Sequence, residues 1–249
     1  MTLTLHRFGS GGQRGLWLHG WLGEGREGEA LQAALGDGFQ LLCPDLPGHG
    51  DTRLEGWTLA RTLQKIAECA PDYDWAGGYS MGGRLLMMSA ARFPDAFRSL
   101  VIESAALGLG DPGQRAARKQ QDRERADQLR RQGLEDFCAE WYGMEMWGGF
   151  EGFPRRRGDA GELADALEIF SLGAQPDLRS WLRSCSSRIL WMAGEKDPDY
   201  AEQARWVKTH SRHSVVLLNC GHNLHTQLPE TWAEHVRSFL APRPGSPDQ

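Results

Sequence analysis

Short apolar runs alternate with segments of helical character along the first hundred residues of the chain, and again after about residue 184. The apolar runs lie at 16–19, 39–43, 73–77, 99–103, 188–193 and 214–218. Helix formers or apolar residues at helical spacing occupy 28–35, 58–69, 84–93, 200–210 and 229–240. Compact apolar runs predict buried strands, and their alternation with helices indicates a mostly parallel central sheet with helices on both faces.

The middle of the chain breaks this pattern. No strand is predicted from Leu107 to about Leu182, where a charged helix at 111–131 is followed by helices at 134–142 and 161–172. A helical stretch inside an alternating chain predicts an insertion that covers a site as a lid. We therefore expect an α/β core formed by 1–106 and 184–241, a helical lid at 107–183, and a disordered tail at 242–249, which is rich in Pro, Gly and Ser.

Composition and charge narrow the class of protein. The 249 residues are 40% hydrophobic and 24% charged, with a net charge of −5, which disfavours a general nucleic-acid or anionic-membrane binder. Five scattered cysteines form no CxxC pair, as expected of reduced thiols in a cytoplasmic protein. No apolar run approaches the roughly 18 residues of a membrane span, and the first residues lack a signal-peptide core, so we expect no membrane insertion.

The segment Gly78-Tyr79-Ser80-Met81-Gly82 carries the first chemical signal. It reads Gly-x-Ser-x-Gly and lies between a predicted strand and a predicted helix. This context is that of a nucleophile elbow, in which a tight turn exposes the serine hydroxyl beside a backbone N–H at a helix N-terminus. The motif alone is weak evidence in a chain with 31 glycines, and its weight depends on its partners.

Those partners follow two later strands, in the order Ser80, Asp197, His222. This is the Ser…Asp…His order of α/β-hydrolases, in which an imidazole takes the serine proton and a carboxylate orients the imidazole. His225 competes with His222 for the role of base, and Asp199 and Glu195 compete with Asp197. Apart from His19, the remaining histidines are expected at surface or helix-capping positions. They are His6, His49, His210, His213 and His235.

A second strand end is predicted to complete an oxyanion hole, together with the backbone N–H at the elbow. The strand at 16–19 runs into His19-Gly20-Trp21, so the backbone N–H groups of Trp21 and Met81 are predicted to converge on one oxygen. His19 is expected to hydrogen-bond loop backbone and to play no part in proton transfer. No HExxH or similar metal-binding spacing occurs.

Several segments of the chain resemble one family more closely than the rest of the superfamily. Three segments are common to many members of the superfamily: Leu18-His19-Gly20-Trp21, Asp45-Leu46-Pro47-Gly48-His49-Gly50 and the elbow. Other segments are more specific to the family: Glu103-Ser104-Ala105, Gln114-Arg115-Ala116-Ala117-Arg118 with Asp122, Trp141-Tyr142, Gln175-Pro176-Asp177-Leu178 and Gly221-His222-Asn223 with His225. Over nearly its whole length the chain is similar to the SHCHC synthases (2-succinyl-6-hydroxy-2,4-cyclohexadiene-1-carboxylate synthases) of menaquinone biosynthesis.

The resemblance implies a lyase with an α/β-hydrolase fold. Members of this family eliminate pyruvate from 2-succinyl-5-enolpyruvyl-6-hydroxy-3-cyclohexene-1-carboxylate without an acyl-enzyme. Ser80, activated by His222 and Asp197, would be the base, and Trp21 and Met81 would stabilise the enolate of the succinyl ketone. The family implies a small-molecule tricarboxylate substrate, no metal and no organic cofactor.

The substrate-binding residues implied by the resemblance are Tyr79, Arg84, Arg118, Trp141 and Arg155. Guanidinium groups suit the three carboxylates of the substrate. Arg156 and Arg157 compete with Arg155, since the alignment can slip by one in this run of arginines. A solvated helix face is the alternative for Arg118, because the surrounding helix is charged throughout. The segments 144–154 and 156–159 depart from the family pattern.

Two other functions remain open on the same fold. One is a true hydrolase of esters or C–C bonds, although the basic start of the lid disfavours an apolar acyl substrate. The other is a non-catalytic binding protein, which the intact set of Ser80, Asp197 and His222 disfavours.

Overall fold

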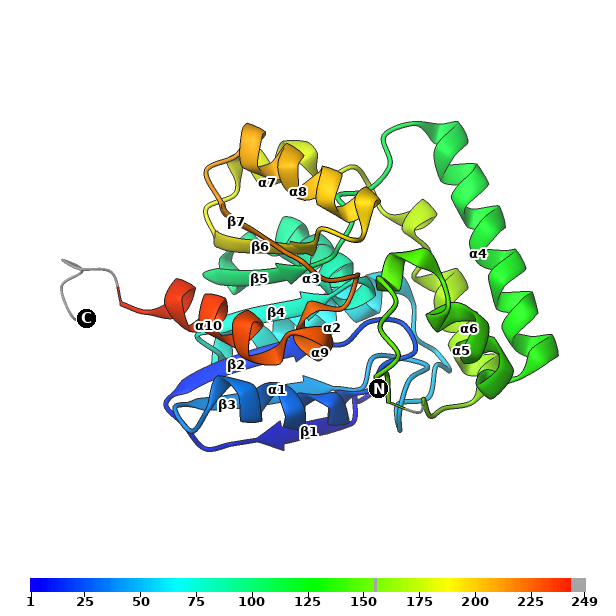
Figure 1. Ribbon diagram of the computed structural model, residues 1–249, viewed down its shortest axis with the longest axis horizontal. Helices are drawn as coiled ribbons and strands as arrows, with labels where there is room; N and C mark the ends of the chain where they lie inside the picture. Colours follow the sequence, from blue (N-terminus) through cyan, green and yellow to red (C-terminus); the bar gives the residue numbers. More distant parts are fainter. Residues whose placement is uncertain (155, 243–249) are drawn as a thin grey trace.

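A seven-stranded sheet runs through the computed structural model, which describes residues 1–154 and 156–242 (Figure 1). Its strands follow the order β1-β3-β2-β4-β5-β6-β7. β1 pairs antiparallel with β3, and the other pairs are parallel. The strands are β1 Leu5–Phe8, β2 Gln13–Leu18, β3 Phe39–Pro44, β4 Trp75–Tyr79, β5 Ser99–Glu103, β6 Arg188–Gly194 and β7 Ser214–Leu218.

Helices cover both faces of the sheet because side chains alternate along each buried strand. Leu16 and Leu18 of β2 belong to a core on one face that includes residues of α2, α3 and α8, whereas Trp17 belongs to the core on the opposite face with residues of α1 and α10. These helices are α1 Gly28–Leu35, α2 Leu59–Cys69, α3 Met81–Arg92, α8 Pro198–His210 and α10 Pro229–Leu240. The alternating apolar runs of the sequence thus fill two cores, one on each side of the sheet.

The parallel register brings the carboxyl ends of the strands to one edge of the sheet. In β4 and β5, Tyr79 lies opposite Glu103, and in β6 and β7, Gly194 lies opposite Leu218. The residues that follow these strands are Ser80, the turn before Asp197, and the turn before His222. Open α/β sheets form their sites at this edge.

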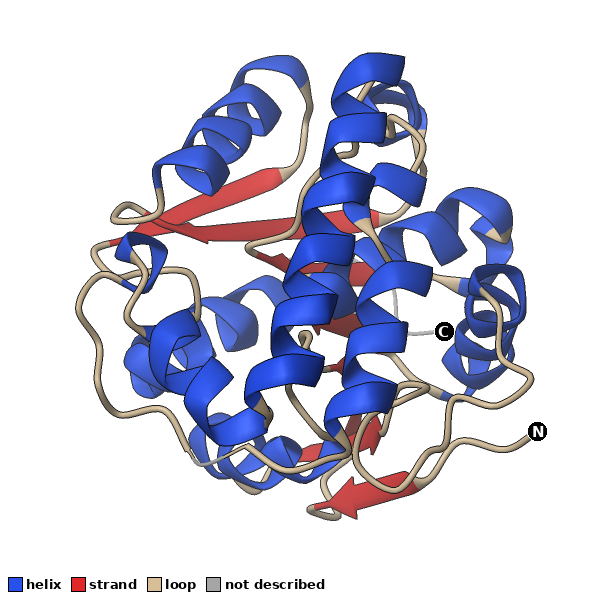
Figure 2. Ribbon diagram, turned by 90° about the vertical axis from the view of Figure 1, so that its right-hand side faces the viewer, coloured by secondary structure: helices blue, strands red, loops and turns tan. Residues whose placement is uncertain are grey.

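The segment between β5 and β6 is helical and lies beyond this edge. It contains α4 Pro112–Gln132, α5 Leu134–Tyr142, α6 Ala160–Ile169 and α7 Arg179–Ser184, and its described residues include no strand. α4 to α6 stand to the right of the sheet in Figure 1, and Figure 2, seen from that side, shows helices in front of the strand ends. Leu129, Phe137 and Leu163 join α4, α5 and α6 in a small core of their own, which also includes Leu22 of the core domain.

The structure adds elements that the apolar pattern did not predict: β1, α7 and the short α9 Leu224–Gln227. β1 is an edge strand with half-exposed or exposed residues throughout, so it carries no apolar run. All five cysteines are free thiols. No helix in the described ranges is long and apolar enough to cross a membrane. The predicted tail at 242–249 lies outside the described residues except for residue 242.

Candidate active site

Ser80 occupies a strained turn between β4 and α3. Its φ of 51° and ψ of −111° are unusual for a residue with a side chain. The turn closes because glycines flank it: a Cβ on Gly82 would lie 2.3 Å from the Leu18 carbonyl oxygen, and one on Gly78 would lie 2.7 Å from the backbone of α3. The same close approach sets the N-terminus of α3 against the end of β2.

The three residues selected by their order in the sequence form one hydrogen-bonded chain. Ser80 Oγ lies 2.9 Å from His222 Nε2, and His222 Nδ1 lies 2.5 Å from Asp197 Oδ2. Asp197 and His222 are buried, and Ser80 is half-buried. The imidazole therefore has one nitrogen on a carboxylate and the other on the hydroxyl, which is the arrangement of a serine activated by a base.

The structure separates His222 from its competitor His225. His225 Nδ1 lies 2.9 Å from both carboxylate oxygens of Glu103, which is fully buried at the end of β5. The same carboxylate accepts the Leu224 N–H at 2.8 Å, while the Glu103 carbonyl accepts the Ser80 N–H at 2.9 Å. Glu103 thus ties the turn after His222 to the turn that carries Ser80.

The sequence predicts that two backbone N–H groups lie beside Ser80. Trp21 and Met81 both line the cavity that contains the hydroxyl, and neither backbone N–H has a hydrogen-bond partner among the described residues. His19 holds the loop before Trp21: its Nδ1 lies 2.8 Å from the Gly20 oxygen, and its Nε2 accepts the Leu46 N–H at 2.9 Å. Burial lowers the pKa of His19 to about 4, so the ring is neutral and acts as a brace, as the sequence predicted.

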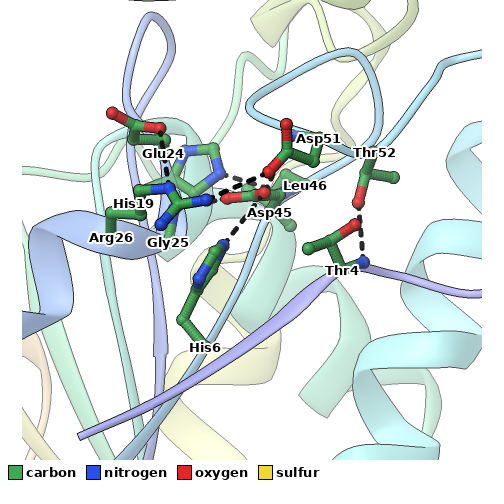
Figure 3. A network of polar contacts seen from close by, with 10 residues as sticks. All are labelled: Thr4, His6, His19, Glu24, Gly25, Arg26, Asp45, Leu46, Asp51 and Thr52. Carbon is green, nitrogen blue, oxygen red and sulfur yellow. Dashed lines mark hydrogen bonds and ion pairs between the residues drawn. The ribbon is translucent and has the colours of Figure 1, made fainter.

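The buried carboxylate of Asp45 binds the loop that follows β2 (Figure 3). Asp45 accepts the backbone N–H groups of Gly25 at 2.7 Å and Asp51 at 2.9 Å, and it pairs with His6 at 3.1 Å. The loop after β3 is therefore fixed to the loop after β2 by side-chain acceptors.

His49 contradicts the prediction of a surface or capping position. Its ring is buried 5.0 Å from the ring of His19, and its Nε2 has no partner among the described residues. Burial, followed by the proximity of His19, lowers the pKa of His49 to about 3. The turn-rich sequence around His49 suggested an exposed loop, but this loop folds under the helical segment, where Gly48 approaches Glu162 and Ala166 of α6.

The cavity beside Ser80 has a volume of about 250 Å³ and combines aromatic rings with cations. It is lined by the predicted residues Trp21, Tyr79, Ser80, Met81, Arg84, Arg118, Trp141, Asp197 and His222, together with Gln121, Arg125, Met144, Met146, Trp147, Leu167, Asp199 and Tyr200. Groups from the strand ends and from α4 and α5 therefore meet in one space.

Arg84 and Arg118 reach this cavity in different ways. Arg84 is 6% exposed and donates to the Phe170 oxygen at 2.8 Å and to Gln175 Oε1 at 3.4 Å. Burial lowers the pKa of Arg84 to about 10, which leaves it protonated at neutral pH. Arg118 donates its Nε to Asp122 at 2.8 Å, and Ser171 Oγ donates to the other oxygen of Asp122 at 2.7 Å.

The predicted arginine at 155 lies outside the described residues. Its competitor Arg156 donates to Tyr142 Oη at 2.5 Å and forms an ion pair with Glu27. Arg156 is not among the residues that line the cavity beside Ser80, and Arg157 is exposed.

Sequence reasoning missed several groups that line the cavity. Trp147 and Tyr200 place their rings 5.4 and 4.5 Å from the ring of His222. Arg125 and Gln121 project from α4 into the same space as Arg118. The spacing of 118, 121 and 125 along one helix face could have selected them, but the charge of the whole helix concealed this stripe.

The arrangement can remove a proton and stabilise an oxyanion in a basic, partly aromatic cavity. The ranges 1–154 and 156–242 hold no cluster of three or more potential metal ligands.

The chain matches the alpha/beta hydrolase family over residues 16–235. It is 32% identical over 237 residues to the 2-succinyl-6-hydroxy-2,4-cyclohexadiene-1-carboxylate synthase of Enterobacter sp. (strain 638), covering 90% of each chain. It is 33% identical over 242 residues to the synthase of the same name from Yersinia enterocolitica, covering 91% of this chain and 86% of that one. Among solved structures, MenH from S. aureus superposes with a TM-score of 0.87 at 23% identity, covering 96% of this chain and 98% of that one.

Proposed function

The chain belongs to the α/β-hydrolase family and, within it, to the 2-succinyl-6-hydroxy-2,4-cyclohexadiene-1-carboxylate synthases, and on that premise we propose how its residues work. The enzyme is a carbon–oxygen lyase of menaquinone biosynthesis that eliminates pyruvate from 2-succinyl-5-enolpyruvyl-6-hydroxy-3-cyclohexene-1-carboxylate. The observation that carries the assignment of residues is the hydrogen-bonded set Ser80, His222 and Asp197 inside a cavity lined by arginines.

The elimination begins at ring carbon C2, which bears the succinyl group. Ser80 Oγ takes the C2 proton as its own proton passes to His222 Nε2, 2.9 Å away. The C2–H electrons form the C2–C3 double bond, the C3–C4 double bond moves to C4–C5, and the C5–O bond breaks. Enolpyruvate leaves and becomes pyruvate on protonation, and Asp197 stabilises the transient imidazolium.

The acidity of the C2 proton depends on the neighbouring ketone. Negative charge develops on the ketone oxygen as the proton leaves, and the N–H groups of Trp21 and Met81 are the donors proposed to receive it. The brace at His19 keeps the first of these donors in place.

Arg84 and Arg118 supply charge for the substrate carboxylates. Arg118 uses only its Nε on Asp122, so its two terminal nitrogens remain for a ligand. Tyr79 and Trp141 line the cavity as apolar walls. We propose that 107–183 serves as a lid over this site and that the enzyme works in the cytoplasm, where its five free thiols stay reduced.

The test compares two reactions of the purified protein. Mixed with the enolpyruvyl cyclohexene, the protein is expected to release pyruvate rapidly and to cleave a panel of p-nitrophenyl esters only feebly. Ester cleavage without pyruvate release would leave the triad in place and return the substrate to a hydrolase class.

A further inference from the structure

Arg125 is a cation in the cavity beside Ser80 that forms only a long ion pair with the protein. Its side chain is 19% exposed and lines the same space as Ser80 and His222. No acceptor among the described residues lies within hydrogen-bonding distance of its guanidinium, and its nearest carboxylate oxygen, Asp122 Oδ1, is 3.7 Å away. Five N–H donors on a half-buried guanidinium therefore lack protein partners of good geometry.

Other arginines of α4 use their donors on the protein. Arg115 donates to the Gly173 oxygen, Arg123 donates to Gln120, and Arg130 pairs with three carboxylates. Arg125 instead lies over the ring of Trp141, with its guanidinium carbon 4.7 Å from the ring centre. This cation–π contact uses none of the guanidinium N–H donors, which leaves them for a ligand.

The position of Arg125 differs from that of Arg84 and Arg118. Arg118 and Arg125 are seven residues apart on α4, which is about 10 Å along a helix. Arg118 lines the cavity together with Tyr200, and its charge acts on both Arg84 and Arg125. Arg125 lies against Trp141, whose ring is 5.3 Å from that of Trp21. Arg125 is thus the cavity arginine that lies beside the Trp141 and Trp21 rings.

We propose that Arg125 binds the terminal carboxylate of the substrate's succinyl arm. This rests on the proposed function, in which the ketone of that arm faces the Trp21 and Met81 N–H groups. Only two methylene groups separate this ketone from the terminal carboxylate, so the carboxylate falls near the Trp21–Trp141 end. There it meets the N–H donors of the Arg125 guanidinium.

Burial, followed by the positive charge of Arg118, lowers the pKa of Arg125. A bound carboxylate would offset both effects, since it supplies hydrogen-bond acceptors and negative charge. The carboxylate of Asp122 hydrogen-bonds to Arg118 at 2.8 Å and lies 3.7 Å from Arg125, beyond hydrogen-bond distance.

The experiment compares two stable ligands by calorimetry. 2-(3-Carboxypropanoyl)benzoate keeps a ring carboxylate and the succinyl arm, and 2-butanoylbenzoate ends the same arm in a methyl group. The wild type is expected to bind the first ligand about 10- to 100-fold more tightly, as befits a charge-assisted hydrogen-bonded pair. In Arg125→Met, which retains an apolar stem over Trp141, this preference should fall below about threefold.

Two further variants complete the test. Arg125→Lys should retain part of the preference, and Arg123→Met, an exposed arginine on the same helix, should retain all of it. A wild-type preference that persists in Arg125→Met, or a wild type without preference, overturns the proposal. Pyruvate release by the same wild-type preparation is measured separately, so a failure of the proposed reaction is distinguished from a failure of Arg125.

Discussion

At the scale of single residues, four histidines near the site have four different roles because their partners differ. His222 contacts an acid and a hydroxyl, His225 contacts the buried carboxylate of Glu103, and His19 contacts backbone on both nitrogens. His49 donates to the Pro47 oxygen at 3.1 Å and has no partner on its other nitrogen. The histidine proposed to activate Ser80 therefore coexists with two neutral structural ones.

The two structural histidines predict a loss of stability in mild acid. The pKa of His19 is about 4 and that of His49 about 3 in the folded protein, both below the ordinary value of 6.5. Between these values and pH 6.5 the unfolded chain binds more protons, so stability falls as the pH falls. From pH 7 to pH 5, the free energy of unfolding should drop by about 2 kcal/mol for each histidine.

Urea denaturation at pH 7 and pH 5 checks this expectation. The variant His49→Leu should show a drop smaller by about 2 kcal/mol than the wild type, because one of the two rings is gone. The comparison concerns the change with pH, so a general loss of stability in the variant does not affect it. An equal drop in both proteins would show that His49 does not carry the effect.

At the scale of elements, apolar runs and helical spacing predicted most strands and helices, and the physical reason lies in burial. β4 is buried at every position, and β5 at all but its first residue, so their apolar runs are visible in the sequence. β1 has exposed and half-exposed residues and exists through its pairing with β3, which no local pattern encodes. The four-residue helix α9 is too short to show a period.

The junction between β2 and α3 is the element contact on which the site most depends. A Cβ at Gly82 would lie 2.3 and 2.4 Å from the carbonyl oxygens of Leu18 and His19. Because both contacts are to backbone, Gly82→Ala must push α3 away from β2, which should cost about 2–3 kcal/mol of stability. It should also displace Met81 from the proposed oxyanion site and lower kcat. Gly12→Ala is the matched control, since a Cβ there meets no atom within 4 Å.

Thermal unfolding and pyruvate release, measured on both variants, check this prediction. The control should match the wild type in both measurements. A Gly82→Ala protein with wild-type stability and turnover would show that the junction is free to relax, and that the close approach is not needed.

At the scale of the whole molecule, the site is assembled from residues that are far apart in the chain. Ser80 and His222 are 142 residues apart, and Asp197 comes from a third strand end. Their order and their positions after strands favoured this set over its competitors His225, Asp199 and Glu195, because parallel strands end at one edge. The contact of Glu103 with His225, the burial of His49 and the cavity position of Arg125 were not predictable, since each depends on packing between distant segments.

The central claim is that this assembly uses Ser80 as the base of an elimination. The most direct test is the rate of pyruvate release by Ser80→Ala, whose fold is checked by its melting temperature. We expect kcat to fall by about 10²- to 10⁴-fold with little change in stability, because a positioned base contributes about that much to the rate. Release of pyruvate at the wild-type rate by Ser80→Ala would contradict the account.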